Sequence, residues 1–225
     1  MCIRYYADAD QLVKWSNEVN AWVPLDEWLA RLDTFPGYIG ALVTERSRHQ
    51  KTLEFGTWGM QPPWATAEKY GKNFGRKNAY NAKAETLTQR PTFKPALRGR
   101  RCVVPMTGFF DQLDQHWMFF RPAMTEVLVA AGLYEEPNQV SDMLSYTVVT
   151  TDPNDIVAPV QDRMPAFLTE EDMEKWLNPE TPVEEALALL TTCPNEWLLM
   201  EDFGEIERRK KSVEAPPEPE QGTLF

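Results

Sequence analysis

An antiparallel α+β fold is what the amino-acid sequence predicts, and two observations lead to it. Short runs rich in β-branched and aromatic residues follow one another through the middle of the chain with few helical stretches between them. This order favours an antiparallel sheet over a parallel, doubly wound one. The 225 residues are 43% hydrophobic, enough to bury the core of one large domain or two small ones, so a disordered or fibrous chain is excluded.

The expected strands cover residues 40–44, 53–58, 102–105, 117–121, 127–133 and 144–151. Three helices accompany them. The first, 25–32, follows a proline and has apolar residues at helical spacing. The second, 169–177, starts with a threonine before three acids and stops at an Asn-Pro pair. The third, about 182–192, starts with proline and carries acids in its first turn.

One domain is expected over residues 1–204. From Glu205 the composition changes to charged residues and proline. Such a segment cannot bury a core, so residues 205–225 are expected to form a disordered tail.

Composition also excludes several classes of protein. No run of about 18 apolar residues exists and the N-terminus does not resemble a signal peptide, so we expect a cytoplasmic protein without a membrane span. Cys2, Cys102 and Cys193 lack metal-ligand spacing, and His49 and His116 are the only histidines. We therefore expect no metal site, no disulfide framework and no cofactor.

The formal net charge of −11 argues against a nucleic-acid partner until it is divided along the chain. Between Arg46 and Arg101, thirteen Lys and Arg residues stand against three Glu, which gives this block +10 and leaves −21 elsewhere. Such an asymmetry within one domain indicates a polyanion-binding face. A solvated loop region is the alternative.

Cys2 is the first candidate for chemistry. Because cysteine is small, Met1 is normally removed in front of it, which leaves an α-amine and a thiol on one residue. The α-amine has a reference pKa of about 8 and is substantially unprotonated near neutrality, and the thiolate is the better sulfur nucleophile. With an aldehyde the two groups form an imine and then a thiazolidine ring. Taken alone, an incidental buried cysteine is the simpler interpretation.

Five motifs, in order along the chain, change that interpretation. They are WGMQPPW (58–64), NAKAET (81–86), RCVVPMTGFFD (101–111), AGLYE (131–135) and QDRMP (161–165), the last followed by Trp176-Leu177. From Cys2 to Leu177 they closely resemble the SRAP family, the SOS response-associated peptidases, which sense abasic sites and crosslink to them. The resemblance implies a monomeric α+β domain around a strongly curved, barrel-like antiparallel sheet with peripheral helices. It also implies a positively charged cleft that binds single-stranded DNA with abasic sites.

The resemblance assigns roles residue by residue. Cys2 is the nucleophile that traps the opened sugar as a thiazolidine crosslink, and Asn81 positions the sugar or the cysteine by hydrogen bonds. The other matched positions are expected at the DNA: Arg4, Lys83 and Arg163 on phosphates, Glu85 ordering the basic side chains, and Trp58, Trp64 and Pro36 beside the cleft. From the residues alone, core packing is the expected role of Trp58 and Phe109.

Two catalytic positions differ from the family pattern. Asp111 stands where the family has glutamate, with about 1.5 Å less reach. Gln161 replaces the family's histidine; it can hold a hydroxyl group but exchanges no proton near pH 7. Ile3 also replaces a glycine beside the nucleophile. Three interpretations stay open: slower crosslinking with water or Asp111 moving protons, a different partner residue, or DNA binding without chemistry. We expect crosslinking with altered kinetics, because Cys2, Asn81 and a carboxylate are all present.

Gln221, Leu224 and Phe225 belong to a pentapeptide that resembles the binding motif for the bacterial sliding clamp. On an acidic, proline-rich tether it would recruit the domain to replicating DNA. A tail without function is the alternative.

Two other functions compete with abasic-site crosslinking. One is a non-catalytic single-stranded DNA-binding module tethered to the clamp. The other is an N-terminal-cysteine peptidase, whose nearest form is the self-removal of Met1.

Overall fold

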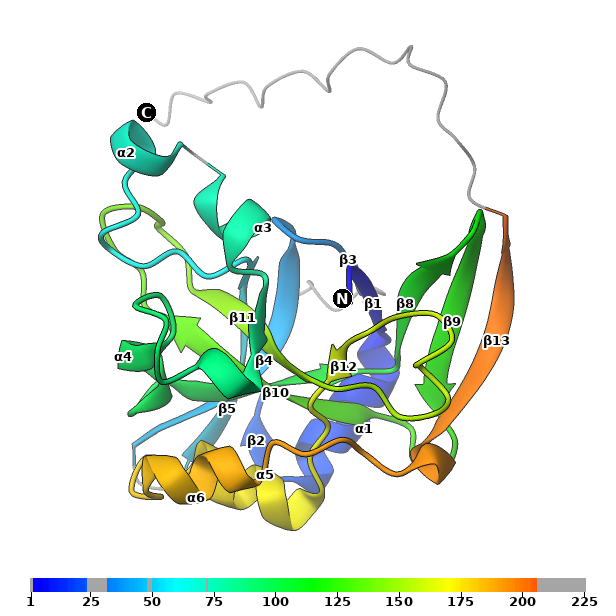
Figure 1. The fold of residues 1–225 in the computed structure, drawn as a ribbon. Coiled ribbons are helices and arrows are strands. Elements are labelled where there is room, and N and C mark those ends of the chain that lie inside the picture. Colours follow the sequence, from blue (N-terminus) through cyan, green and yellow to red (C-terminus); the bar gives the residue numbers. More distant parts are fainter. Residues whose placement is uncertain (1, 24–31, 48–49, 72, 206–225) are drawn as a thin grey trace, which may run out of the picture.

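The structure is a computed structural model that describes residues 2–23, 32–47, 50–71 and 73–205. Two sheets form most of it, and short helices lie outside them (Figure 1). The α+β class predicted from the strand-rich sequence is confirmed. The expected helix over 25–32 and the expected tail lie almost wholly outside the described residues, as do the clamp-motif residues.

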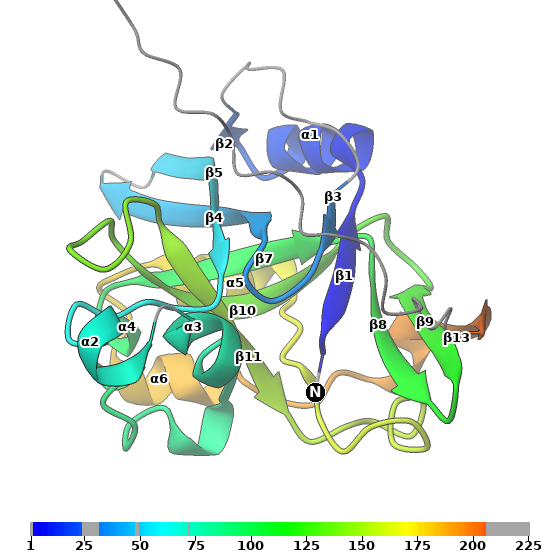
Figure 2. The ribbon, with the colours of Figure 1, turned by 90° about the horizontal axis from the view of Figure 1, so that it is seen from above.

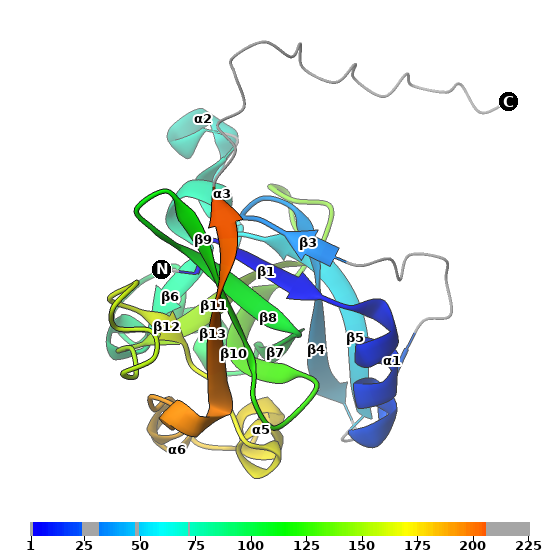
Figure 3. The same ribbon diagram turned by 90° about the vertical axis from the view of Figure 1, so that its right-hand side faces the viewer.

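The first sheet is antiparallel and has the order β13-β9-β8-β1-β3 (Figure 3). Its strands are β1 (Arg4–Ala7), β3 (Leu32–Thr34), β8 (Gly108–Leu113), β9 (His116–Pro122) and β13 (Leu198–Glu205). Figure 2 shows β1 between β3 and β8, with its N-terminal end directed towards β11 of the second sheet. This placement brings the N-terminal end of β1 close to the second sheet.

The second sheet has the order β12-β11-β10-β7-β4-β5-β2, and β6 pairs with β11. Its strands are β2 (Ala21–Trp22), β4 (Ile39–Ser47), β5 (Gln50–Trp58), β6 (Asn81–Lys83), β7 (Arg101–Met106), β10 (Leu128–Glu135), β11 (Ser145–Thr151) and β12 (Met164–Pro165). Because β11 also pairs with β5, the path β11-β10-β7-β4-β5 closes into a ring. The strongly curved, barrel-like sheet implied by the motifs is confirmed.

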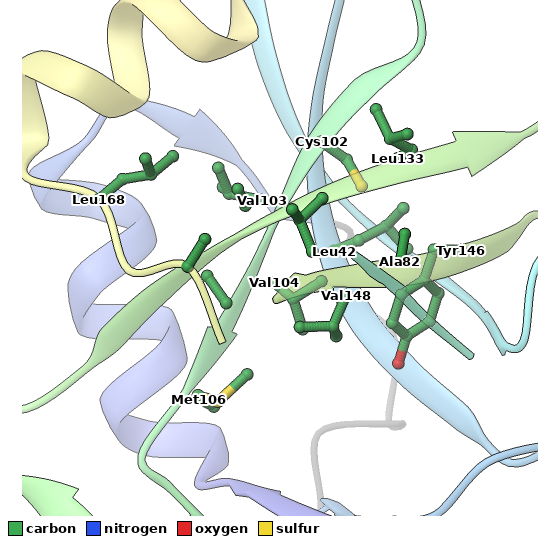
Figure 4. Packing of buried hydrophobic residues seen from close by; sticks show 14 of the residues in the cluster. Leu42, Ala82, Cys102, Val103, Val104, Met106, Leu133, Tyr146, Val148 and Leu168 are labelled. Carbon is green, nitrogen blue, oxygen red and sulfur yellow. The ribbon is translucent and has the colours of Figure 1, made fainter. Parts of the chain in front are cut away.

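The hydrophobic core lies inside this ring of strands and between the ring and the helices that pack against it. Every residue of β7 and β11 is buried. Burial along the whole strand fits the largely β-branched sequence of β11 and the central valines of β7. Figure 4 shows Val103, Val104 and Val148 packed among side chains of the neighbouring strands. Trp176 covers the outside of β7, and its Nε1 donates to the carbonyl oxygen of Cys102 at 2.8 Å.

In the part of the chain that the structure describes, six short α-helices surround the sheets. They are α1 (Ala9–Glu18), α2 (Ala67–Tyr70), α3 (Phe74–Asn78), α4 (Lys94–Leu97), α5 (Glu170–Leu177) and α6 (Val183–Ala188), with 3₁₀ turns η1 (Ala84–Thr86) and η2 (Asn195–Trp197). The capping signal of α5 is confirmed, since the Thr169 side chain accepts the backbone N–H of Asp172 at 3.1 Å. Among the described residues no helix is both long and apolar enough to span a membrane.

Candidate active site

Cys2 lies where the segment before β1 meets β6. Its side chain is fully buried, and its thiol donates to the carbonyl oxygen of Arg4 at 3.7 Å. From β6, Nδ2 of Asn81 donates to the carbonyl oxygen of Cys2 at 2.7 Å. Asn81 reaches this position because β6 pairs in parallel with β11, with Asn81 opposite Val148. The structure thus joins the predicted nucleophile and the predicted amide, 79 positions apart in the chain.

One acceptor of Asn81 is unsatisfied. Its Oδ1 is buried and accepts no hydrogen bond from any residue that the structure describes. A buried polar atom without a partner costs about 1–3 kcal/mol and calls for an explanation. Beside a nucleophile, such an atom is typical of a position that binds a ligand donor, for example a sugar hydroxyl group.

A buried carboxyl group and an amide lie next to the thiol. Asp111 on β8 is 3% exposed, and its Oδ1 accepts from Nε2 of Gln161 at 3.1 Å and from the backbone N–H of Gln112 at 3.0 Å. Burial raises the pKa of Asp111, although these hydrogen bonds act in the opposite direction. The four predicted catalytic residues, Cys2, Asn81, Asp111 and Gln161, therefore come together in one place.

Burial shifts both the thiol and the carboxyl group towards their neutral forms. Burial first, and then the charge of Asp111, raise the pKa of the Cys2 thiol to about 12. A thiolate is therefore scarce near neutrality, and the thiol needs a proton acceptor at the moment it attacks. Asp111 is the titratable side chain whose charge acts on the thiol most strongly.

Arg163 is a buried guanidinium group that pairs with two exposed carboxylates. Its side chain is 7% exposed, and it donates to both carboxylate oxygens of Glu85, at 3.0 and 2.9 Å, and to Asp152 at 2.7 Å. It also donates to the carbonyl oxygen of Thr150 at 2.6 Å. These bonds attach the loop before β12 to η1 and β11, and a phosphate contact by Arg163 stays a prediction.

Arg4 is also paired. Its Nε and one terminal nitrogen donate to the two carboxylate oxygens of Asp33, both at 2.8 Å, and the same terminal nitrogen donates to the Tyr6 hydroxyl at 2.7 Å. The guanidinium carbon lies 4.3 Å from the ring centroid of Phe110 and 5.2 Å from that of Trp117. A bidentate carboxylate and aromatic faces are the surroundings that arginine favours. Arg4 would have to leave Asp33, at least in part, to bind a phosphate, and that role stays a prediction.

The aromatic and proline positions differ in exposure. Trp58 is fully buried at the end of β5, and its Nε1 donates to a backbone carbonyl at 2.6 Å, as expected of a core residue. Trp64 is 40% exposed and packs edge-on against Tyr70 and Phe74, with ring centroids 5.3 Å away in both cases. Pro36 is half-buried in the turn between β3 and β4. A stacking surface for bases is therefore available at Trp64 but not at Trp58.

The basic block is only partly a surface feature. Lys51 and Arg101 are buried, and Arg100 pairs with Glu135 at 3.1 Å. Seven other cations among the described side chains are exposed and follow one another from α2 to just beyond α4: Lys69, Arg76, Lys77, Lys83, Arg90, Lys94 and Arg98. Figure 1 draws these helices along one side of the molecule. A polyanion-binding face is thus available, but it is narrower than the block of sequence that predicts it.

Sequence reasoning missed two partners near the site. Tyr5 and Tyr146 are fully buried and share a hydrogen bond of 2.5 Å, in a space kept open by Gly40, whose added Cβ would lie 2.1 Å from the Tyr5 hydroxyl. A separation of 141 positions leaves no local signal for that pair. Asp33 was also missed as the partner of Arg4, although the motif match placed Pro36 three residues away.

Within the described residues, no group of three or more His, Cys, Asp and Glu side chains is placed to hold a metal ion.

Two relatives of known sequence resemble most of the folded part of the chain. The abasic site processing protein YoqW of Bacillus subtilis (strain 168) is 30% identical over 190 residues, which cover 80% of this chain and 81% of the relative. The abasic site processing protein HMCES of Xenopus tropicalis is 30% identical over 173 residues, which cover 65% of this chain and 51% of the relative.

Solved structures share the fold. A protein from Bordetella bronchiseptica superposes with a TM-score of 0.77 at 24% identity, over 90% of this chain and 100% of that one. A protein from Bacteroides thetaiotaomicron gives a TM-score of 0.75 at 23% identity, over 89% and 91%. The family model described as SOS response associated peptidase (SRAP) matches residues 1–203. Since that match covers nearly the whole described fold, the chain belongs to the SRAP family.

Proposed function

We propose that the protein binds single-stranded DNA and traps abasic sites covalently through Cys2 after removal of Met1. The observation that carries the proposal is the placement of Cys2, with Asn81 on its carbonyl group and the buried carboxyl group of Asp111 acting on its thiol. The relatives named as abasic site processing proteins support this choice of substrate.

An abasic nucleotide carries the functional group that this site would capture. Its ring-opened deoxyribose has an aldehyde at C1′, and a sugar without a base enters a pocket at lower cost than a paired nucleotide. The α-amine of Cys2 adds to the aldehyde and water leaves, which gives an imine. The thiol then adds to the same carbon and closes a thiazolidine ring. Two new bonds join the protein to C1′, and the reaction needs no cofactor.

Asn81 orients both reactants. Its Nδ2 holds the backbone of Cys2, and its buried Oδ1 accepts a hydroxyl group of the opened sugar. Holding nucleophile and electrophile in one geometry converts a bimolecular reaction into an effectively unimolecular one. Asp111 supplies acid–base assistance from within reach of the thiol.

The DNA strand follows the exposed cations between α2 and α4. Lys83 is exposed and stands two residues after Asn81, so it is well placed to bind a phosphate next to the trapped sugar. Trp64 offers a ring for base stacking, which contributes about 1–3 kcal/mol per base without sequence preference. Pro36 borders the same path, because Arg76 packs against the neighbouring Gly37.

The test incubates purified protein with single-stranded DNA that contains one abasic site and separates the products on a denaturing gel. Wild-type protein is expected to give a slow-migrating covalent band and Cys2→Ser to give none. Cys193→Ser is the matched control, because Cys193 is buried beside Asn154, outside the Cys2 site. Cys2→Ala, which keeps the α-amine, should give a stable band only after borohydride reduction of the imine. If wild-type protein gives no band while mass spectrometry shows Met1 to be absent, the covalent function is wrong.

A second candidate is a single-stranded DNA-binding module without chemistry, which the loss of the family's imidazole at Gln161 favours. Equal affinity for abasic and intact strands, with no Cys2-dependent product, would support it. A third is an N-terminal-cysteine peptidase. It requires turnover of amide substrates by a protein that is inert towards abasic DNA.

We further propose that Gln221, Leu224 and Phe225 bind a bacterial sliding clamp. The support is the sequence pattern alone. A labelled peptide of residues 206–225 titrated with the clamp should bind, and a peptide carrying both Leu224→Ala and Phe225→Ala should not. Equal behaviour of the two peptides would contradict the proposal.

A further inference from the structure

The side-chain amide of Gln161 donates a hydrogen bond to Asp111, and its orientation is fixed. Its Nε2 lies 3.1 Å from Oδ1 of Asp111, while its Oε1 accepts the backbone N–H of Asp162 at 3.0 Å. Because the oxygen end of the amide is matched to an N–H donor, the NH₂ end must face the carboxyl group. The amide is thereby held as a hydrogen-bond donor to Asp111, and it neither releases nor takes up a proton near pH 7.

We infer that Gln161 is a positioning residue that holds Asp111, and that Asp111 alone carries the proton through both steps of crosslinking. The inference rests on the proposed function, which supplies the aldehyde and the α-amine. It deepens that function by assigning the acid–base work to a single titrating side chain.

One carboxyl group is sufficient because the two steps need opposite proton transfers. Protonated Asp111 gives its proton to the carbinolamine oxygen. The C1′–O bond then breaks and a water molecule departs. An iminium ion and the Asp111 carboxylate remain. As the Cys2 sulfur bonds to C1′, the thiol proton passes to the carboxylate and the π electrons of the C=N bond return to nitrogen. The thiazolidine is neutral and Asp111 is protonated again, so the proton balance closes without a second residue.

The groups that face Asp111 from other elements fit this cycle. Among the described residues they include the Cys2 thiol, the Tyr80 phenol and the Gln161 amide. The charge of the N-terminal amine lowers the pKa of Asp111, and once Met1 is removed that amine belongs to Cys2. Burial first, and then the charges of Cys2 and Asp111, raise the pKa of Tyr80, so that the phenol stays neutral. Burial also raises the pKa of Asp111, which keeps more of it protonated at a pH where the α-amine begins to lose its proton.

The test is the pH profile of the crosslinking rate. The rate needs protonated Asp111 and unprotonated α-amine, so the profile has a lower inflection at the pKa of Asp111 and an upper one at that of the amine. Gln161→Met keeps the side-chain length and removes the donor. We expect its lower inflection to move up by about one pH unit, because a carboxylate that loses a hydrogen bond is protonated more readily. Asp111→Asn should lose the lower inflection, with a rate about 10²–10⁴-fold lower.

Two results would overturn the inference: a slower Gln161→Met protein with an unchanged lower inflection, or a lower inflection that persists in Asp111→Asn. A rise of about tenfold or more in the rate of Gln161→His at pH 7 would also overturn it, because a second proton carrier would then have been missing. Carbon-13 NMR titration of the Asp111 carboxyl group, in wild-type protein and in Gln161→Met, measures the same shift without DNA. If wild-type protein forms no crosslink, the proposed function fails, and the NMR titration still decides whether Gln161 controls Asp111.

Discussion

Replacing Arg163 by methionine separates a structural cation from a DNA-binding one. Its partners Glu85 and Asp152 are exposed, so they return to water in the variant, and each such pair contributes about 0–1 kcal/mol. Thr150 is fully buried, and its carbonyl loses a charged donor, which costs about 1–3 kcal/mol. We therefore expect Arg163→Met to lose about 1–5 kcal/mol of unfolding free energy. Each kcal/mol lowers the Tm of a domain of this size by about 2–4 °C.

Lys83→Gln is the matched control, because Lys83 is exposed in the same region. Thermal unfolding is measured for both variants and the wild type, and affinity for intact single-stranded DNA is measured over a salt series. Each phosphate contact that is lost lowers the slope of log affinity against log salt by about 0.7. We expect Arg163→Met to lower the Tm and keep the slope, and Lys83→Gln to do the reverse. An unchanged Tm with a reduced slope in Arg163→Met would refute the reasoning.

Three further predictions concern other side chains. Trp58→Phe should cost about 1–3 kcal/mol of stability, because a buried carbonyl group loses the indole N–H that donates to it. The affinity for DNA should stay unchanged below the Tm. A loss of affinity without a loss of stability would contradict the role of Trp58 in the core. Asp33→Asn should strengthen the binding of single-stranded DNA at low salt, because the variant removes the negative charge that pairs with Arg4. Equal or weaker binding would show that Arg4 does not reach a phosphate. The hydrogen bond to Asp202 raises the pKa of His116. The pair therefore stabilises the fold fully at pH values below the pKa of an unfolded histidine, about 6.5. This stabilisation is lost as the pH rises through the pKa of His116 in the folded protein. His116→Gln should therefore flatten that part of a Tm series between about pH 5 and 8, and an unaltered series would count against the pair.

The strands that could be predicted from the sequence are those with both a β-branched run and a buried face. β7 and β11 are buried along their whole length, with the β-branched run at Val103 and Val104 in β7 and over Thr147–Thr151 in β11. β13 was missed because it is exposed at nearly every position, so that its sequence resembles that of a loop. This strand continues through Glu205, and the folded domain therefore extends one residue past its expected end. α1 was missed although Leu12, Trp15 and Val19 stand at helical spacing and pack in or against the core. The predicted third helix is shorter in the structure, where α6 ends at Ala188.

The members of the site could be named from motifs, but their contacts could not. Asn81 reaches Cys2 through the parallel pairing of β6 with β11, and Asp111 lies near it through the pairing of β8 with β1, in which Arg4 stands opposite Phe110. Register between strands far apart in the chain depends on the packing of whole sheets, and no local spacing contains it. The pairing of Arg4 with Asp33 was hidden for the same reason.

The cations of residues 46–101 that the structure describes differ in their surroundings. Lys51 pairs with Glu174 of α5, and Arg101 donates to the carbonyl oxygen of Trp176 on the same helix, so both hold α5 against the sheet. Their charges are buried and already partnered, and they attract no phosphate. The seven exposed cations between α2 and α4 are different, because at physiological salt the field of acidic residues elsewhere on the molecule is screened beyond about 8 Å. A net charge of −11 therefore does not exclude the proposed binding of a polyanion at a local face, and a count of basic residues bears on that binding only after the buried ones are subtracted.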